Sequence, residues 1–266
     1  MKGRVLIIAG SDSGGGAGIQ ADVKTVTALD GYAATAISAL TAQDTRTVHA
    51  IHDVPVPFIR LQMELALLDI GADALKTGML SKPEVIDAVR EEIDLHAPGI
   101  PLVVDPVMVA KGGTRLLDTG AERALIERLL PRATVLTPNA TEAEALTGMP
   151  VTTFAEQDRA AERLLQLGAP AVLVKGGHIA GDEVRDLLLS PDGRREFRSP
   201  RLPATSTHGT GCTLASAIAT GLAQGLELHE AVARAHAYVH KAIETAPGFG
   251  HGNGPLNHTH TVKPYG

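Results

Sequence analysis

Residues 207–224 read THGTGCTLASAIATGLAQ, a pair of glycines followed by an alanine-rich run. The run predicts a helix from about Gly211 to Gln224, and the glycines allow a tight turn just before it. Such a helix start directs unpaired backbone N–H groups and the positive end of the dipole at one point, which suits an anion such as a phosphoryl group. Cys212, the single cysteine, lies in this segment. The alternative is a plain strand-to-helix turn in which Cys212 is a small buried apolar residue.

Short apolar runs alternate with helical patterns along the chain. Val5–Ala9 precedes a glycine-rich loop, Pro101–Val104 ends before Asp105, and Ala171–Val174 ends before Lys175. Strands that alternate with helices predict an α/β fold with a mainly parallel sheet covered by helices on both faces. Functional groups in such folds gather beyond the carboxyl ends of the strands, where the polar motifs of this chain lie.

Length and composition fit a single domain, residues 1–266, with residues 261–266 as a flexible tail. Hydrophobic residues make up 44% of the chain, which is enough for a substantial core. The net charge of −6 argues against nucleic acid as a partner. With four Phe, three Tyr and no Trp, a base-stacking platform is not expected either.

The sequence also predicts a cytoplasmic protein that binds no membrane. A single cysteine allows no internal disulfide and fits a reducing compartment. The N-terminus lacks the apolar core of a signal peptide. No apolar run approaches the roughly 20 residues of a membrane span.

The loop Gly10–Gly18 is rich in glycine but matches neither common nucleotide-binding pattern. It lacks the Gly-Lys-Ser/Thr ending of a P-loop and the Gly-x-Gly-x-x-Gly spacing of a dinucleotide site. Such a loop can close its backbone over a small flat ligand, or it can simply turn a strand into a helix. Asp22, one turn into the next helix, either hydrogen-bonds a ring amino group or is a first-turn acid favoured by the helix dipole.

Two side chains follow the next predicted strands, and one of them, Gln43, suits the same flat ligand. The Gln43 amide both donates and accepts hydrogen bonds, which matches the edge of an aminopyrimidine. Met79 follows the third strand. The alternatives are that Gln43 belongs to an ordinary loop and that Met79 fills the core.

Four polar residues fit a site for magnesium and phosphate. Asp105 either caps a turn or faces a ligand or Mg²⁺. Asn139 and Glu142 open a helix with the spacing of a capping box, and the same two residues can order magnesium and phosphates. Lys175 ends a buried strand, where a lysine is costly unless its charge meets an anion such as a nucleotide phosphate.

Seven motifs in order resemble the hydroxymethylpyrimidine/phosphomethylpyrimidine kinases of thiamine biosynthesis, from about residue 4 to about residue 260. Each motif alone is weak, but their ordered coincidence is specific. The motifs are GSDSGGGAGIQAD (10–22), AQDT (42–45), KTGML (76–80), VDPVM (104–108), TPNATEA (137–143), KGGH (175–178) and HGTGCT (208–213).

The resemblance implies a ribokinase-like fold, a three-layer α/β/α arrangement whose central sheet is mostly parallel. It implies an ATP-dependent kinase that phosphorylates 4-amino-5-hydroxymethyl-2-methylpyrimidine and then the monophosphate, for thiamine diphosphate biosynthesis. It also implies Mg²⁺ as a cofactor and a homodimer as the assembly. A requirement for a monovalent cation is left open.

The resemblance also implies roles for individual residues. The expected pyrimidine-binding residues are Gly10, Asp22, Gln43, Met79 and Val107. The expected ATP-binding residues are Asn139, Lys175 and Thr210, and the expected magnesium-binding residues are Asp105 and Glu142. The expected anion hole is Gly209, Thr210, Gly211 and Cys212, and together with Lys175 it makes up the catalytic group.

Cys212 stands where related sugar kinases carry an aspartate base, so a sugar kinase is not expected. The helix dipole favours a Cys212 thiolate that accepts the substrate's hydroxyl proton. The rival view is that Cys212 only shapes the anion hole.

Two other functions stay open. A pyridoxal or pyridoxine kinase acts on a similar flat nitrogen ring with a hydroxymethyl group. A non-catalytic pyrimidine-sensing protein can use the same fold, although the joint presence of Asp105, Glu142, Lys175 and Cys212 argues against it.

Overall fold

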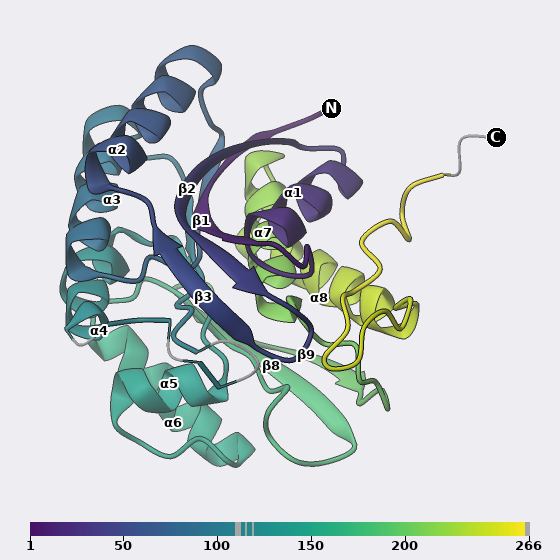
Figure 1. The fold of residues 1–266 in the computed structure, drawn as a ribbon. Helices are drawn as coiled ribbons and strands as arrows, with labels where there is room; N and C mark the ends of the chain where they lie inside the picture. Colours follow the sequence, from purple (N-terminus) through teal and green to yellow (C-terminus); the bar gives the residue numbers. More distant parts are fainter. Residues whose placement is uncertain (110–112, 115, 119, 264–266) are drawn as a thin grey trace.

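The computed structural model describes residues 1–109, 113–114, 116–118 and 120–263. Its strands form one sheet with helices on both faces (Figure 1). The strands are β1 (Arg4–Asp12), β2 (Tyr32–Gln43), β3 (Val48–Asp53), β4 (Ala74–Thr77), β5 (Leu102–Val104), β6 (Val135–Leu136), β7 (Val172–Val174), β8 (Glu183–Ser190) and β9 (Gly193–Pro200). The α-helices are α1 (Gly18–Ala28), α2 (Val56–Leu65), α3 (Pro83–His96), α4 (Ala121–Ala124), α5 (Ala140–Thr147), α6 (Phe154–Gln166), α7 (Thr210–Ala223) and α8 (Leu228–Glu244). Shorter helical turns are η1 (Ala66–Ile70), η2 (Leu125–Leu129) and η3 (Leu130–Arg132).

The strand order in the described sheet is β3-β2-β1-β4-β5-β6-β7-β8-β9. The central strands, from β2 to β7 in that order, pair in parallel. Strand β3 at one end of this order, and β8 and β9 at the other, pair antiparallel to their neighbours. The predicted mainly parallel sheet is confirmed, and the carboxyl ends of its parallel strands meet at one edge.

Two apolar cores lie between the sheet and the helices that cover its two faces. Leu6 and Ile8 of β1 pack in the core beneath α2, α3 and α6. Val5 and Ile7 of the same strand pack in the core beneath α1, α7 and α8. Because these side chains are at most 1% exposed on either face, β1 is a continuous apolar run rather than an alternating pattern.

The sequence pattern did not predict β3. Its side chains are mostly exposed because it pairs only with β2, at the edge of the sheet. No apolar run therefore marks it. Strand β3 therefore lies beside the end of β2 at Gln43, on the outer side of the sheet.

The tail predicted to begin at residue 261 is described only as far as residue 263; residues 264–266 lie outside the described part. Before that point the chain packs on the domain. The backbone N–H of Asn257 donates to the carbonyl of Ala242 on α8, and the Tyr238 hydroxyl donates to the carbonyl of His258.

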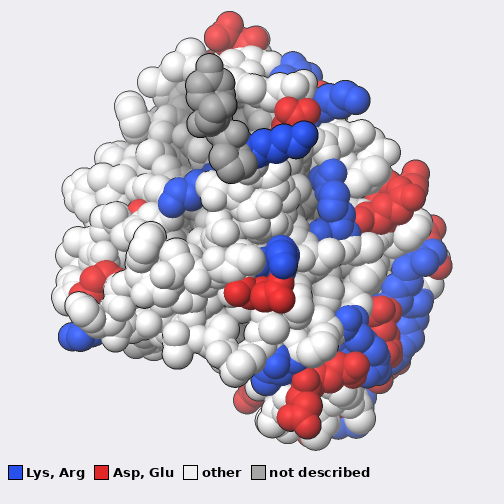
Figure 2. Space-filling model, turned by 90° about the vertical axis from the view of Figure 1, so that its right-hand side faces the viewer, with Lys and Arg blue, Asp and Glu red and all other residues white. Residues whose placement is uncertain are grey.

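No helix in the described ranges is long and apolar enough to cross a membrane. Figure 2 shows acidic and basic side chains interspersed on the face that it presents. A broad basic area is the usual electrostatic footprint of nucleic-acid binding, and that face has none. The prediction that nucleic acid is not a partner stays a prediction.

Leu75 lies in β4 with no exposed surface, and Leu95 lies in α3 with 70% of its surface exposed. We expect Leu75→Ala to lower the free energy of unfolding by about 2–5 kcal/mol, because it leaves a cavity between sheet and helices. Leu95→Ala is the matched control and should change it by less than about 0.5 kcal/mol. Denaturant unfolding of both variants checks this, and equal losses would contradict the assignment of the core.

Candidate active site

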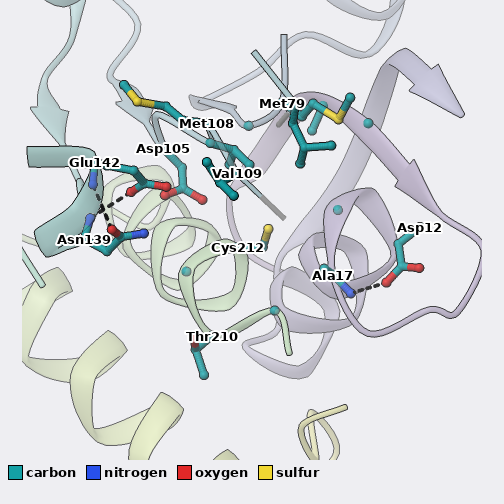
Figure 3. A pocket seen from close by; sticks show the side chains of 18 of the residues that line it. Asp12, Ala17, Met79, Asp105, Met108, Val109, Asn139, Glu142, Thr210 and Cys212 are labelled. Carbon is teal, nitrogen blue, oxygen red and sulfur yellow. Dashed lines mark hydrogen bonds between the residues drawn. The ribbon is translucent and has the colours of Figure 1, made fainter. Parts of the chain in front are cut away.

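A cavity of about 630 Å³ lies at the edge of the sheet where the parallel strands end. Figure 3 shows its side chains converging from several elements, with Cys212 between Asp12 and the pair Asp105 and Glu142. Residues that follow β1, β2, β4, β5, β6 and β7 all contribute to its lining. The polar motifs therefore meet at the carboxyl ends of the strands, as predicted, with the exception of the Asp22 side chain.

The glycine turn before α7 forms one wall of the cavity. Gly209 precedes α7 with a φ of 82°, a left-handed conformation that favours glycine. A side chain there would also collide with the carbonyl oxygen of Gly16 in the first loop. The described N-terminus of α7 has no side-chain cap, so its first backbone N–H groups face the cavity that Gly209, Thr210, Gly211 and Cys212 line.

Cys212 lies at this helix start, where burial and the helix dipole act on its thiol in opposite directions. Burial raises the pKa of the Cys212 thiol to about 12, against the lowering effect of the Lys76 ammonium. Burial thus opposes the effect of the helix dipole on this thiol, and the role of its thiolate stays a prediction. Removing the thiol from water outweighs the partial charge at the helix end.

Two buried carboxylates share one ammonium group on the opposite side of the cavity. Lys175 Nζ lies 3.0 Å from Asp105 Oδ1 and 4.0 Å from Glu142 Oε2. Burial raises the pKa of Glu142 to about 7, although the charge of Lys175 lowers it. The two carboxyl groups can thus carry more negative charge than the single ammonium of Lys175 neutralises.

Asn139 and Glu142 form the predicted capping box. The Glu142 N–H donates to Asn139 Oδ1 at 3.0 Å, and the Asn139 N–H donates to Glu142 Oε2 at 2.8 Å (Figure 3). Both residues also line the cavity. The structural and the ligand-facing interpretations of this pair therefore hold together.

This donor set fits a magnesium ion that a phosphate-bearing ligand brings with it. No group of three or more potential metal-ligating His, Cys, Asp or Glu side chains occurs in the described ranges. Mg²⁺ usually takes one or two carboxylates and completes its shell with water and substrate phosphates. Asp105 and Glu142 supply such a pair, with excess negative charge for a cation to meet.

The residues predicted to hold a flat ring line the cavity, with one exception. Gly10, Gln43, Met79 and Val107 all belong to its lining. A side chain at Gly10 would press against the Met79 sulfur at 3.1 Å, so the glycine leaves room for the methionine to pack on β1.

Asp22 is the exception, because it does not line the cavity. Its carboxylate has no exposed surface; it accepts hydrogen bonds from Lys76 at 2.8 Å and from Ser216 at 2.7 Å. The expectation of a direct hydrogen bond from a ring amino group is not supported in this arrangement, since α1 turns the side chain toward α7 and β4.

Sequence reasoning missed Asp12 and His208. Asp12 accepts hydrogen bonds from the backbone of Gly14, Gly16 and Ala17 and contacts His208 Nε2 at 2.9 Å. Burial would raise the pKa of the Asp12 carboxyl, but the hydrogen bonds from His208 and the loop hold it below its ordinary value. Asp12 therefore ties the first loop to the residue before the Gly209 turn. The signal was an acid inside a glycine-rich loop, where carboxylates often bind neighbouring N–H groups.

A second cavity of about 220 Å³ adjoins the first. Its lining includes residues from β8, α7 and α8. Asn139, Lys175 and Thr210, the three residues predicted to bind ATP, line both cavities. A ligand that extends through both would place its middle at these residues.

The raised pKa of Glu142 predicts a pH effect on stability. The folded chain holds this proton more tightly than the unfolded chain, whose glutamate titrates near 4.5. The free energy of unfolding therefore falls as the pH rises from about 4.5 to about 7, and the loss is complete above that. Glu142→Gln keeps the capping box and should remove this fall.

Thermal unfolding of the two proteins across this pH range makes the measurement. Glu144→Gln, on the exposed side of the same helix, is the control. An unchanged slope in Glu142→Gln would show that this carboxyl does not titrate as described.

Comparison with known proteins agrees with the geometry. A family model described as phosphomethylpyrimidine kinase matches residues 12–257. The chain is 48% identical over 263 residues to the hydroxymethylpyrimidine/phosphomethylpyrimidine kinase of Rhizobium meliloti, and the match covers 98% of each chain. It is 52% identical over 258 residues to the thiamine biosynthesis bifunctional protein ThiED of Geobacter sulfurreducens; this match covers 97% of the chain but 52% of that protein, so the chain spans about half of it.

A solved structure shares the fold over almost the whole chain. The ADP complex of Bacillus subtilis pyridoxal kinase superposes with a TM-score of 0.91 at 35% identity, covering 97% of this chain and 98% of that one. The expected ribokinase-like fold is confirmed. From its sequence and its structure, the chain belongs to the phosphomethylpyrimidine kinase family.

Proposed function

We propose that this protein is an ATP-dependent kinase that phosphorylates 4-amino-5-hydroxymethyl-2-methylpyrimidine and then its monophosphate, for thiamine diphosphate biosynthesis. The observation that carries the proposal is that the larger cavity joins a wall suited to a flat ring with an anion-binding helix start and a carboxylate pair. The name of the Rhizobium meliloti relative, which matches over nearly its full length, supports the same substrates.

The ring binds at the end of the cavity formed by the first loop and β2. Gln43 offers an amide that can pair with the amino group and ring nitrogen of an aminopyrimidine. Met79 and Val107 offer apolar contact with the faces of the ring. Gly10 keeps the backbone of β1 close to this space.

The ATP phosphates bind where the two cavities meet. Lys175 and the N-terminus of α7 supply positive charge there, and Asn139 and Thr210 flank it. Asp105 and Glu142 would hold Mg²⁺, which supplies charge neutralisation to the phosphates when it is bound. The ADP complex of the similar pyridoxal kinase supports a nucleotide site in this fold.

Phosphoryl transfer asks a protein mainly for alignment and charge stabilisation. The hydroxymethyl oxygen lies in line with the γ-phosphorus, and the N–H groups of Gly209–Cys212 stabilise the transferring group. Cys212 receives the hydroxyl proton as a thiolate. In the second step the acceptor is a phosphate, which is already largely ionised near neutral pH, so it needs no such base.

This assignment predicts a pH effect on the first step only. Because the pKa of Cys212 is raised to about 12, its thiolate fraction grows about tenfold for each pH unit below that value. The ratio of first-step to second-step kcat should therefore rise steeply between about pH 7 and pH 9. Other titrations, such as that of Glu142, affect both steps and cancel in the ratio.

Cys212→Ala is the matched variant for this measurement, and it should lose the rise while it keeps the second step. Cys212→Ser tests a weaker acid in the same place. A flat ratio in the wild-type protein, or near-normal first-step turnover in both variants, would reduce Cys212 to a residue that only shapes the anion hole.

Product analysis by mass spectrometry tests the function itself. The protein is incubated with ATP, Mg²⁺ and either hydroxymethylpyrimidine or pyridoxal. Mono- and diphosphorylated pyrimidine are expected. Phosphorylation of pyridoxal alone would make this a vitamin B6 kinase, the alternative that the similarity to pyridoxal kinase favours. If neither substrate gives a product, the remaining alternative is a non-catalytic pyrimidine-sensing protein.

The homodimer and the cytoplasmic location stay predictions from the resemblance and the composition. Phe58, Leu61 and Leu65 of α2 and Leu68 of η1 are large apolar side chains that remain exposed in the single chain. They give this side of the molecule a surface that a second copy would suit.

A further inference from the structure

Lys76 is a fully buried lysine to which the proposed reaction assigns no role. It lies on β4 with no exposed surface. Its ammonium lies 2.8 Å from Asp22 Oδ2, and the other oxygen of that carboxylate accepts a hydrogen bond from Ser216 at 2.7 Å. A buried ammonium is costly unless it is paired, so Asp22 is the partner that keeps it charged.

The cluster of Lys76, Asp22 and Ser216 lies beside the part of the cavity that Cys212 lines. Lys76 follows Ala74 by two residues on β4, so its side chain projects from the same face, toward α1 and α7. Gly78 leaves room for the ammonium, because a side chain there would meet it at 3.0 Å. Ser216 follows Cys212 by one turn of α7, and Lys76 and Cys212 both line the cavity.

Four charged groups act on Cys212 from the elements packed around it. Lys76 on β4 and Lys175 after β7 are positive, and Asp22 on α1 and Asp105 after β5 are negative. Burial raises the pKa of the thiol, Lys76 is the main influence that lowers it, and the two carboxylates raise it further. Burial alone would lower the pKa of Lys76, but the negative charges around it leave it raised, so it stays an ammonium.

We infer that Lys76 is a positioning residue whose ammonium, held by Asp22 beside α7, supplies the fixed positive charge that supports the Cys212 thiolate. This inference rests on the proposed function, in which that thiolate receives the hydroxyl proton. In that step the substrate O–H bond breaks and an S–H bond forms. The freed oxygen bonds to the γ-phosphorus, and the bond from that phosphorus to the bridging oxygen breaks, with its electron pair leaving on ADP.

A purely structural role is the competing explanation, in which Lys76 and Asp22 only pin α1 to β4. Alkylation of Cys212 by iodoacetamide separates the two, because only the thiolate reacts and the chain has no other cysteine. Cys212 is partly exposed in the cavity, so the reagent can reach it. The readout requires no kinase activity.

The main variant is Lys76→Met/Asp22→Asn, which removes both charges together and leaves no buried charge unpaired. We expect its alkylation rate at pH 8 to fall about tenfold, the change that one unit of thiol pKa produces. Ser216→Ala is the matched control: it removes a hydrogen bond from the same cluster without removing a charge, and its rate should stay within twofold of the wild type. Circular dichroism verifies that each variant is folded.

Asp22→Asn is the second variant, and it keeps the proposal testable if the double variant does not fold. It leaves the buried ammonium without its partner, so Lys76 gives up its charge and alkylation should slow to about the rate of the double variant. A loosened structure would instead speed alkylation in the double variant and in Ser216→Ala. That result, unchanged rates in the double variant, or alkylation of Asp22→Asn as fast as or faster than that of the wild type would overturn the inference.

The kinetic consequence is a lower first-step kcat for the double variant with little change in KM. An equal reduction of the second-step kcat would show that Lys76 does not act through Cys212. Failure of the proposed function would be distinguishable, because it would abolish products from the wild-type protein while leaving the alkylation result intact.

Discussion

The parallel pairing of β1 with β2 and β4 is the constraint on which the rest of the structure depends. It forces each connection to cross the sheet as a helix, and it brings the carboxyl ends of strands that lie far apart in the sequence to one edge. Asp12 and His208, separated by 196 residues, come within 2.9 Å of each other there. The strand topology therefore brings the site residues together, and the individual side chains act within the place that it fixes.

The energetic character of the site follows from the same burial that stabilises the fold. Charged groups at the strand ends are withdrawn from water, so each needs a partner: Lys175 meets Asp105, and Lys76 meets Asp22. Glu142 is incompletely compensated, because burial raises its pKa more than the charge of Lys175 lowers it. The nucleotide and its metal complete this balance in the proposed reaction.

The sequence predicted residues that directly follow apolar strands well, because a strand end fixes where the next side chain lies. Lys175 after β7 and Asp105 after β5 are of this kind. It failed where orientation depends on packing: Asp22 lies on α1, and only the contact with α7 and β4 decides that it faces Lys76. Strand β3 lacked a pattern because it is an exposed edge. Lys76 was overlooked because one lysine in a short strand carries no sign of its burial.

The half-buried thiol of Cys212 has a consequence for the chemistry of oxidation. Peroxides attack the thiolate, and the sulfenic acid that forms is the first step toward irreversible damage. With its pKa raised to about 12, Cys212 is almost entirely protonated near neutral pH. The one cysteine of the chain is therefore protected from oxidants that attack thiolates, by the same desolvation that keeps its thiol protonated.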